Sequence, residues 1–340
     1  MNYPLEEVHI ILPPNNLVVN NLISEAQETI LLSRQAVPNA NFCNVLIAAK
    51  NRGVKINMLL SSPFYFRKLS VSEIRKRFNS IAEEIISYTQ ATVPEKEKWI
   101  SILVENGIEI RYINHKKYLL NHSKYVIIDS NLAYIGSAPN ETTNRLDVGV
   151  VTSCPKQIKI LQQLFNADFY NKKFNLSKDS YNLLIAPETM RDKIEQLIDE
   201  AEYSISMMFP LITDDDRIFQ IIKNKSKSGV VIRAICTPNM FSLDDNIILD
   251  HKFLLKLIEI GVELKFSYDP PIHCRVISVD TECLNKKKLY IGSGHLKTHC
   301  FNFNREVGVI TSLPKAVSEI TNLFKNLWDK LPKPILGNLL

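Results

Sequence analysis

Two short segments of the chain carry the same chemically active residue types at the same spacing. The residues are His122, Lys124 and Asp129 in NHSKYVIID and His273, Arg275 and Asp280 in IHCRVISVD. A neutral imidazole can act as a nucleophile or general base, and a protonated one as a general acid. A cation can neutralise charge on oxygen atoms, and a carboxylate can orient the ring and stabilise its charged form. One copy is therefore only part of a catalytic site, whereas two copies offer both an attacking group and a proton donor.

The apolar run after each histidine predicts a β-strand that presents these side chains. Alternate side chains of a strand share a face, so His122 and Lys124 should point the same way, opposite to Ser123 and Tyr125. Asp129 has the opposite parity, but it begins the DSN turn, where the chain reverses and the alternation ends. One segment therefore predicts an imidazole beside a fixed cation, with a carboxylate near the turn.

Other phrases of the chain also return in the same order, which indicates an internal repeat. The matching pairs are NLISEAQETI (21–30) with QLIDEAEYSI (196–205), RGVKINMLL (52–60) with SGVVIRAIC (228–236), LVENGIEIRY (103–112) with LIEIGVELKF (257–266), AYIGSA (133–138) with LYIGSG (289–294), and DVGVVTSCPKQI with EVGVITSLPKAV. We predict two homologous halves, residues 1–172 and 181–335, joined by the polar stretch NKKFNLSKDS.

Within each half, the pattern predicts helices that alternate with strands. Leu22, Ile23, Ala26 and Ile30 recur at helical spacing, whereas VKINMLL, IEIRYI, KYVIID and LAYIG are short, β-branched and bounded by Gly, Asn or Asp. This α/β pattern predicts a largely buried sheet covered by helices. The FNADF and FKNLW segments should end a helix in each half.

The two motifs together resemble the phospholipase D superfamily. Its signature is H-x-K-x4-D followed by G-S and commonly Asn, once in each half, and here both motifs are followed by IGS. The resemblance covers nearly the whole chain. It implies two homologous α/β/α sandwich halves with mixed sheets, related by a pseudo-twofold axis, with both motifs in one cleft between them.

The resemblance also implies roles for the six motif residues. His122 is assigned as the nucleophile that forms a phosphohistidine, and His273 as general acid and then as base for the water that releases the intermediate, although the order could be reversed. Lys124 and Arg275 would neutralise the non-bridging oxygens. Asp129 and Asp280 would each orient a histidine; this completes the expected catalytic set.

Further residues near the motifs match the family less evenly. GSAPN places Asn140 one position later than the usual G-S-x-N, and GSGHL places His295 where that Asn is usual. Arg275 replaces a lysine, and such exchanges are not neutral at phosphate sites. The expected supporting residues are Ser137, Asn140, Ser293, His295, Asn304 and Glu306.

These features predict a metal-independent phosphodiesterase, with a phospholipid as the favoured substrate and either hydrolysis or transfer to an alcohol as the reaction. A nuclease with the same chemistry is the alternative, and a catalytically impaired member that binds membranes or partners is another. No cofactor is expected, because two histidines suffice and His, Cys and carboxylate residues do not show ligand spacing. Oligomeric state is left open.

Composition limits the setting of the protein. The chain has 340 residues, is 45% hydrophobic and carries a net charge of +5, so it can bury substantial cores but has no broad basic coat for duplex DNA. Six scattered cysteines favour a reduced, intracellular setting, cytoplasmic or peripherally membrane-associated, and no apolar run is long enough to span a membrane. The aromatic and basic segment 64–78 favours a solvated helix or loop, with binding of a lipid headgroup, a membrane surface or single-stranded nucleic acid as the alternative.

Overall fold

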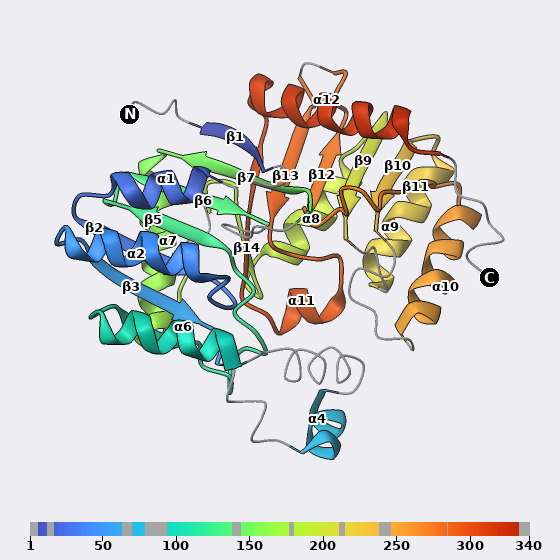
Figure 1. The fold of residues 1–340 in the computed structure, drawn as a ribbon. Helices are drawn as coiled ribbons and strands as arrows, with labels where there is room; N and C mark the ends of the chain where they lie inside the picture. The colour runs from blue at the N-terminus through green and yellow to red at the C-terminus, as the bar shows by residue number, and fades with distance from the viewer. Residues whose placement is uncertain are drawn as a thin grey trace.

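The protein is represented by a computed structural model, which describes residues 6–11, 17–62, 70–78, 94–137, 144–176, 180–210, 215–237, 246–283 and 285–332. These residues form two seven-stranded sheets with helices packed against them (Figure 1). The α/β fold with two similar halves, predicted from the repeated phrases, is confirmed.

The first sheet has the strand order β1-β7-β6-β5-β2-β3-β4. Strands β2, β3 and β4 are parallel and the remaining neighbours are antiparallel, so the sheet is mixed. The parallel part requires helical crossovers, which the repeated helical phrases supply. The strands are β1 (Glu6–Ile11), β2 (Thr29–Ser33), β3 (Lys55–Leu60), β4 (Glu109–Tyr112), β5 (Tyr125–Ile128), β6 (Leu132–Gly136) and β7 (Asp147–Thr152).

The second sheet has the order β11-β10-β9-β12-β13-β14-β8. Read from β8, this is the order of the first sheet read from β1, with each strand replaced by its counterpart in the other repeat. The strands are β8 (Leu183–Ala186), β9 (Ser204–Phe209), β10 (Val231–Cys236), β11 (Glu263–Phe266), β12 (Val276–Val279), β13 (Lys288–Gly292) and β14 (Glu306–Thr311).

Helices divide the apolar interior into three layers. Helices α1, α2 and α6 share one core with the first sheet, and α8, α9 and α10 share another with the second. Between the sheets, α7 and α12 pack with strands of both halves in a single cluster, so the halves are joined by a common core (Figure 1). The helices are α1 (Val18–Glu25), α2 (Ala40–Asn51), α4 (Val71–Phe78), α6 (Pro94–Glu105), α7 (Pro155–Phe169), α8 (Met190–Asp199), α9 (Asp216–Lys227), α10 (Asn246–Glu259), α11 (Thr298–Asn302) and α12 (Pro314–Lys330). FNADF thus ends α7 as predicted, and FKNLW lies in the last turns of α12.

Tyrosine rings packed on glycines hold the strands next to the two motifs. Strands β6 and β7 pair Gly136 with Gly149, and a Cβ atom at either glycine would overlap the ring of Tyr134. The second half repeats this arrangement around Tyr290. These contacts explain the glycines of the repeated YIGS and VGV phrases. They also keep the end of one strand close to the start of the next, where the predicted supporting residues lie.

Some of the predicted features fall partly outside the described residues. Of the segment 64–78, the structure describes only residues 70–78, where α4 stands apart from the two sheets in Figure 1. Within the described ranges, no helix has both the length and the apolar character needed to cross a membrane. Peripheral contact with a membrane stays a prediction.

Candidate active site

The first motif histidine lies just before a strand and is held there by backbone from the other half. Strand β5 begins at Tyr125. His122 and Lys124 therefore precede the strand, whereas the pattern of alternate side chains predicts that they lie on it. The N–H of His122 donates to the carbonyl of Arg305 at 3.0 Å, and the N–H of Arg305 donates to the carbonyl of Leu120 at 2.8 Å. This pairing fixes the histidine against the segment that leads into β14.

The second motif is held by the corresponding contacts, in which the first half supplies the backbone groups. The N–H of His273 donates to the carbonyl of Leu146 at 2.9 Å, and the N–H of Leu146 donates to the carbonyl of Pro271 at 2.8 Å. Leu146 leads into β7 of the first half. Each histidine is therefore positioned by the start of a strand that belongs to the other repeat.

Each imidazole is bonded through Nδ1 to a buried carboxylate of the other half. His122 Nδ1 lies 2.8 Å from Glu306 Oε2, and His273 Nδ1 lies 2.7 Å from Asp147 Oδ1. A neutral ring that donates from Nδ1 carries a lone pair on Nε2, which is then the atom available for chemistry. The two imidazole–carboxylate pairs are related by the repeat, because DVGV begins at Asp147 and EVGV begins at Glu306.

The expectation that Asp129 and Asp280 orient the histidines is corrected by these contacts. The carboxylate of Asp129 accepts hydrogen bonds from the backbone N–H groups of residues 27, 28 and 29, at 2.8–2.9 Å. Asp280 does the same with residues 202, 203 and 204. A strand rises about 3.3 Å per residue, so the five steps along β5 or β12 place the Cα atom of each aspartate about 16 Å from that of the cationic residue in its own motif. Both aspartates tie the turn at the far end of a strand.

Serine and asparagine side chains hold the two carboxylates in place. Ser293 Oγ donates to Glu306 Oε2 at 2.6 Å, and Asn304 Nδ2 donates to Oε1 at 3.1 Å. Ser137 Oγ donates to Asp147 Oδ1 at 2.5 Å in the other half. The predicted supporting serines thus act on the carboxylates that orient the rings. Residue 140, the remaining asparagine of the predicted set, lies outside the described residues.

The two cations make the same first contact and then differ. Lys124 Nζ donates to the carbonyl of His122 at 2.8 Å, and Arg275 Nη1 donates to the carbonyl of His273 at 2.7 Å. Arg275 also donates from Nε and Nη2 to His295 Nε2, at 3.2 and 2.6 Å. The rings of His295 and His122 have centroids 5.5 Å apart. These contacts bring both motifs into one site.

The electrostatics of the first pair favour a neutral imidazole beside an ionised carboxylate. Burial raises the pKa of Glu306, but its interaction with His122 and the hydrogen bonds it accepts outweigh this effect, so its pKa lies below the usual value. Burial lowers the pKa of His122; Glu306 opposes that effect and Lys124 adds to it. At neutral pH, His122 therefore has an unprotonated Nε2.

The second pair has a more basic carboxylate. Burial raises the pKa of Asp147 to about 6, against the hydrogen bond from Ser137 and the positive charge of Arg275. A carboxylate with this pKa is mostly ionised at neutral pH, so it can still stabilise a protonated His273. The two histidines thus share a geometry but differ in the acid strength of their partners.

A buried arginine fastens the segment that carries Glu306. Arg305 has no exposed surface, and its guanidinium donates to both carboxylate oxygens of Asp168, at 2.7 and 3.0 Å, and to the hydroxyl of Tyr118. It also donates to Glu188 at 2.5 Å. Because Asp168 and Tyr118 belong to the first half, this network holds the backbone next to His122 and joins the halves.

The sequence reading missed Asp147 and Arg305. Asp147 could have been found, because the repeated phrases align its position with Glu306, which had been selected. Arg305 had no such signal, because the residue aligned with it is the apolar Leu146. Its importance depends on Asp168, which is 137 positions earlier in the chain.

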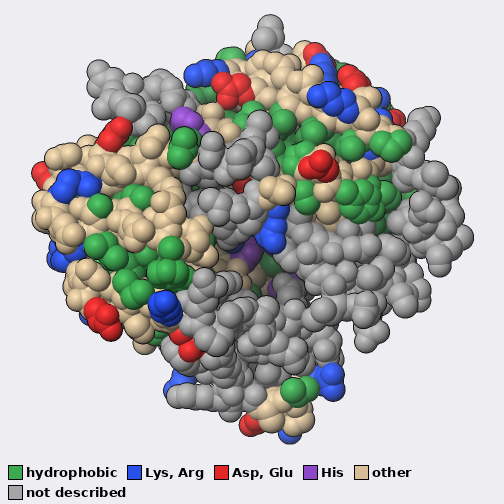
Figure 2. Space-filling view, viewed as in Figure 1, with side chains coloured by type: hydrophobic (Ala, Val, Ile, Leu, Met, Phe, Trp, Pro, Cys, Tyr) green, Lys and Arg blue, Asp and Glu red, His purple; other side chains and the backbone are tan. Residues whose placement is uncertain are grey.

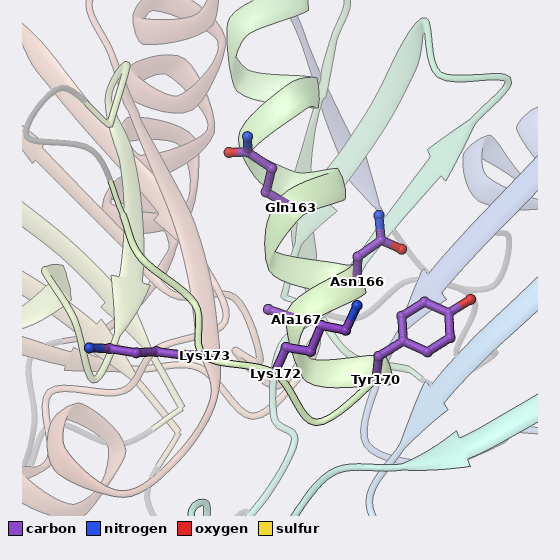
Figure 3. Close-up of a pocket in the computed structure, with 6 residues that line it drawn as sticks. All are labelled: Gln163, Asn166, Ala167, Tyr170, Lys172 and Lys173. Carbon is purple, nitrogen blue, oxygen red and sulfur yellow. The ribbon is translucent and has the colours of Figure 1, made fainter.

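The middle of the molecule is hollowed between its two halves. Figure 2 shows histidine side chains and Lys or Arg side chains in that hollow. A separate hollow of about 450 Å³ lies at the end of α7 (Figure 3). None of the motif residues lines it; its lining consists of Gln163, Asn166, Ala167, Tyr170, Lys172 and Lys173. We assign no chemistry to this second hollow.

A two-half α/β fold with one histidine motif in each half defines a protein of the phospholipase D superfamily, as the motifs predicted. The chain belongs to the family described as "Cardiolipin synthase, PLD-like domain", whose sequence profile matches residues 19–169 and 194–328. Among curated proteins, none has significant sequence similarity to it.

Solved structures with a similar fold include a polyphosphate kinase and a phosphatidylserine synthase. The polyphosphate kinase of Porphyromonas gingivalis has a TM-score of 0.68 and 15% sequence identity, over 95% of this chain and 47% of the kinase chain. The phosphatidylserine synthase of Haemophilus influenzae Rd KW20 has a TM-score of 0.66 and 12% identity, over 97% of this chain and 87% of the synthase. The present chain thus spans about half the length of the kinase. At these identities the similarity concerns the fold alone.

Proposed function

We propose that the protein is a phosphodiesterase that acts through a phosphohistidine on His122. The observation that carries the proposal is the pair of imidazoles, each bonded through Nδ1 to a carboxylate from the other half. A phosphodiester needs an attacking group and a proton donor for its leaving oxygen, and two imidazoles held in this way provide both.

In the first step, Nε2 of His122 attacks phosphorus and forms a P–N bond. The P–O bond to the leaving group breaks, and protonated His273 gives its Nε2 proton to that oxygen. Lys124 and Arg275 neutralise the non-bridging oxygens as charge accumulates. In the second step, His273 takes a proton from water or from an alcohol. The resulting nucleophile attacks phosphorus, and the P–N bond breaks.

The favoured substrate is a phospholipid. The matched family is described as a cardiolipin synthase domain, and a phosphatidylserine synthase is among the proteins with a similar fold. Both names point to lipid phosphodiesters. Nucleic acid remains the alternative substrate, because it presents the same reacting group.

The substrate test uses phosphatidylcholine, phosphatidylglycerol, single-stranded DNA and a chromogenic phosphodiester, each with and without EDTA. We expect turnover of a phospholipid that is unchanged by EDTA, since the proposed steps use only side chains. Cleavage of DNA alone would assign the nuclease function. Activity lost with EDTA and restored by one divalent ion would overturn the metal-independent mechanism.

The covalent step is tested with the His273→Asn variant and a substrate that has a good leaving group. The variant should still attack through His122, but it cannot activate water, so the adduct should accumulate. Mass spectrometry after rapid, acid-free denaturation should find a phosphoryl-linked mass on the peptide containing NHSK. An adduct on the IHCR peptide would reverse the two roles. An active wild-type enzyme with no adduct on either peptide in any variant would rule out the covalent path.

A further inference from the structure

The two motif cations differ in a way that involves a third histidine. Lys124 Nζ and Arg275 Nη1 occupy corresponding places, since each donates to the carbonyl of the histidine two residues before it, at 2.8 and 2.7 Å. The guanidinium therefore brings an additional edge, made of Nε and Nη2, for which the lysine has no equivalent. In the second half this edge meets His295.

Burial makes an acceptor for this edge necessary. Arg275 is only 1% exposed, and a buried N–H group without an acceptor is costly. Its bonds to the carbonyls of His273 and Ser137, at 2.7 and 3.3 Å, and the two bonds to His295 Nε2, use four of its five N–H groups. Among the described contacts of the guanidinium, one N–H is thus left for a ligand.

The two halves differ in sequence both at the cation and at the position of His295. Counted from the serine of the repeated IGS phrase, His295 corresponds to Pro139 in the first half. The half with lysine has no imidazole at this place, whereas the half with arginine has one. Burial, followed by the positive charge of Arg275, holds the pKa of His295 well below its usual value, with further contributions from His122, Lys297 and His273. A neutral ring can accept hydrogen bonds at Nε2.

We propose that His295 is a positioning residue that fixes the Arg275 guanidinium by accepting its Nε and Nη2 hydrogens, so that the remaining N–H faces a bound phosphoryl group. This role rests on the proposed function, because it gives Arg275 a phosphoryl ligand. It makes Arg275 and His295 a matched set that replaces a single lysine.

The test compares two substitutions that differ in their ability to accept a hydrogen bond. His295→Gln can place an amide oxygen near the position of Nε2, whereas His295→Phe keeps a ring of similar size without an acceptor. His299→Phe, on the neighbouring helix α11, is the matched control. Thermal unfolding checks that each variant is folded, and His295→Leu replaces the Phe variant if that one is not.

Two measurements report on the guanidinium. The first is the affinity for orthophosphate by calorimetry, and the second is kcat and KM for a chromogenic phosphodiester. We expect His295→Phe to weaken orthophosphate binding about tenfold and to lower kcat about 100-fold, in the range seen when one transition-state donor is lost. His295→Gln and the control should stay within about threefold of wild type, because the acceptor is kept or is not involved.

The His295→Phe substitution, made in an Arg275→Lys background, shows whether His295 acts through the arginine. Lysine has no Nε edge, so His295→Phe should then cost less than about threefold beyond the lysine variant. An equal loss in both backgrounds, or a Gln variant as impaired as the Phe variant, would overturn the proposal. If wild type turns over no phosphodiester, the proposed function fails, while the order of orthophosphate affinities still decides the role of His295.

Discussion

The carboxylates that hold the two motif histidines have different acid strengths, although the repeat relates them. Glu306 has a pKa below its usual value, because hydrogen bonds and His122 outweigh its burial. Asp147 has a pKa raised to about 6, because burial outweighs its hydrogen bond from Ser137. The acid side of the pH profile should therefore be set by Asp147.

We predict that kcat/KM falls as pH decreases through about 6, because a protonated Asp147 no longer stabilises the charged form of His273. Asp147→Asn should lower kcat by roughly 10³-fold and should remove this acid limb. The measurement is the pH dependence of kcat/KM for both proteins, with the chromogenic phosphodiester. An acid limb that persists in the variant would assign it to another group.

The stability of the fold should change with the opposite sign over the same pH range. The folded-state pKa of Asp147 is raised from 3.8 to about 6, so the folded protein binds more protons than the unfolded chain between these values. The contribution of this group to the free energy of unfolding therefore increases as pH falls from about 6 to about 4. Urea unfolding of wild type and Asp147→Asn should show this difference, and it separates loss of activity from unfolding.

The His–cation–Asp spacing was informative about which residues form the site but misleading about which carboxylate serves each histidine. The histidines and cations are local to their motifs, so the sequence was sufficient to find them. The carboxylate partners lie 184 and 126 positions from their histidines, and only the docking of the two halves brings them together. The bond from Arg275 to His295 was likewise unpredictable, because it depends on how the segment that follows β13 lies beside the start of β12.

At the scale of elements, the repeated phrases predicted most of the fold. VKINMLL, IEIRYI, KYVIID and LAYIG became β3, β4, β5 and β6, with ends shifted by a residue or so. The error about Asp129 came from the resemblance of the motif, which assigned the aspartate to its own histidine without regard to the length of the strand between them. Four residues of β5 separate the carboxylate from Lys124, and this distance places it at the opposite end of the strand.

Asp280 provides the test of this element-level correction. It has a φ of +49°, a left-handed conformation that suits Asp better than Ala, and its carboxylate accepts three backbone hydrogen bonds at the start of β9. We predict that Asp280→Ala lowers the free energy of unfolding by about 3 kcal/mol. Asp280→Asn should cost less, because Asn tolerates the same backbone conformation.

Activity distinguishes this structural role from a catalytic one. At temperatures where Asp280→Ala is folded, kcat should remain within about threefold of wild type, a change much smaller than the loss of a catalytic group causes. Thermal unfolding and steady-state kinetics on the same preparation provide both values. A variant with normal stability and greatly reduced kcat would return Asp280 to the catalytic set.

At the scale of the whole molecule, the two halves depend on each other for the site. They share the central core with α7 and α12, and the Arg305 network crosses between them. Neither repeat contains a complete imidazole–carboxylate pair. The arrangement therefore requires both halves of one chain to be folded and docked.

We predict that an equimolar mixture of full-length His122→Asn and His273→Asn stays inactive, because each chain keeps only one working pair within its own fold. The measurement is turnover of the chromogenic phosphodiester after co-refolding, with each variant refolded alone as the control. Recovery to a substantial fraction of wild-type activity would mean that chains exchange halves, and that the site can be assembled between two molecules.

Because each histidine is bonded to a carboxylate of the other half, the pairs are incomplete while the chain is being synthesised. A ribosome makes His122 long before its partner Glu306, which lies 184 positions later. At roughly 5–20 residues per second, the nascent chain carries His122 for about 10–40 s without the carboxylate that bonds to its ring. The His122–Glu306 pair can therefore form only late in translation, and a truncated chain released before Glu306 would lack it.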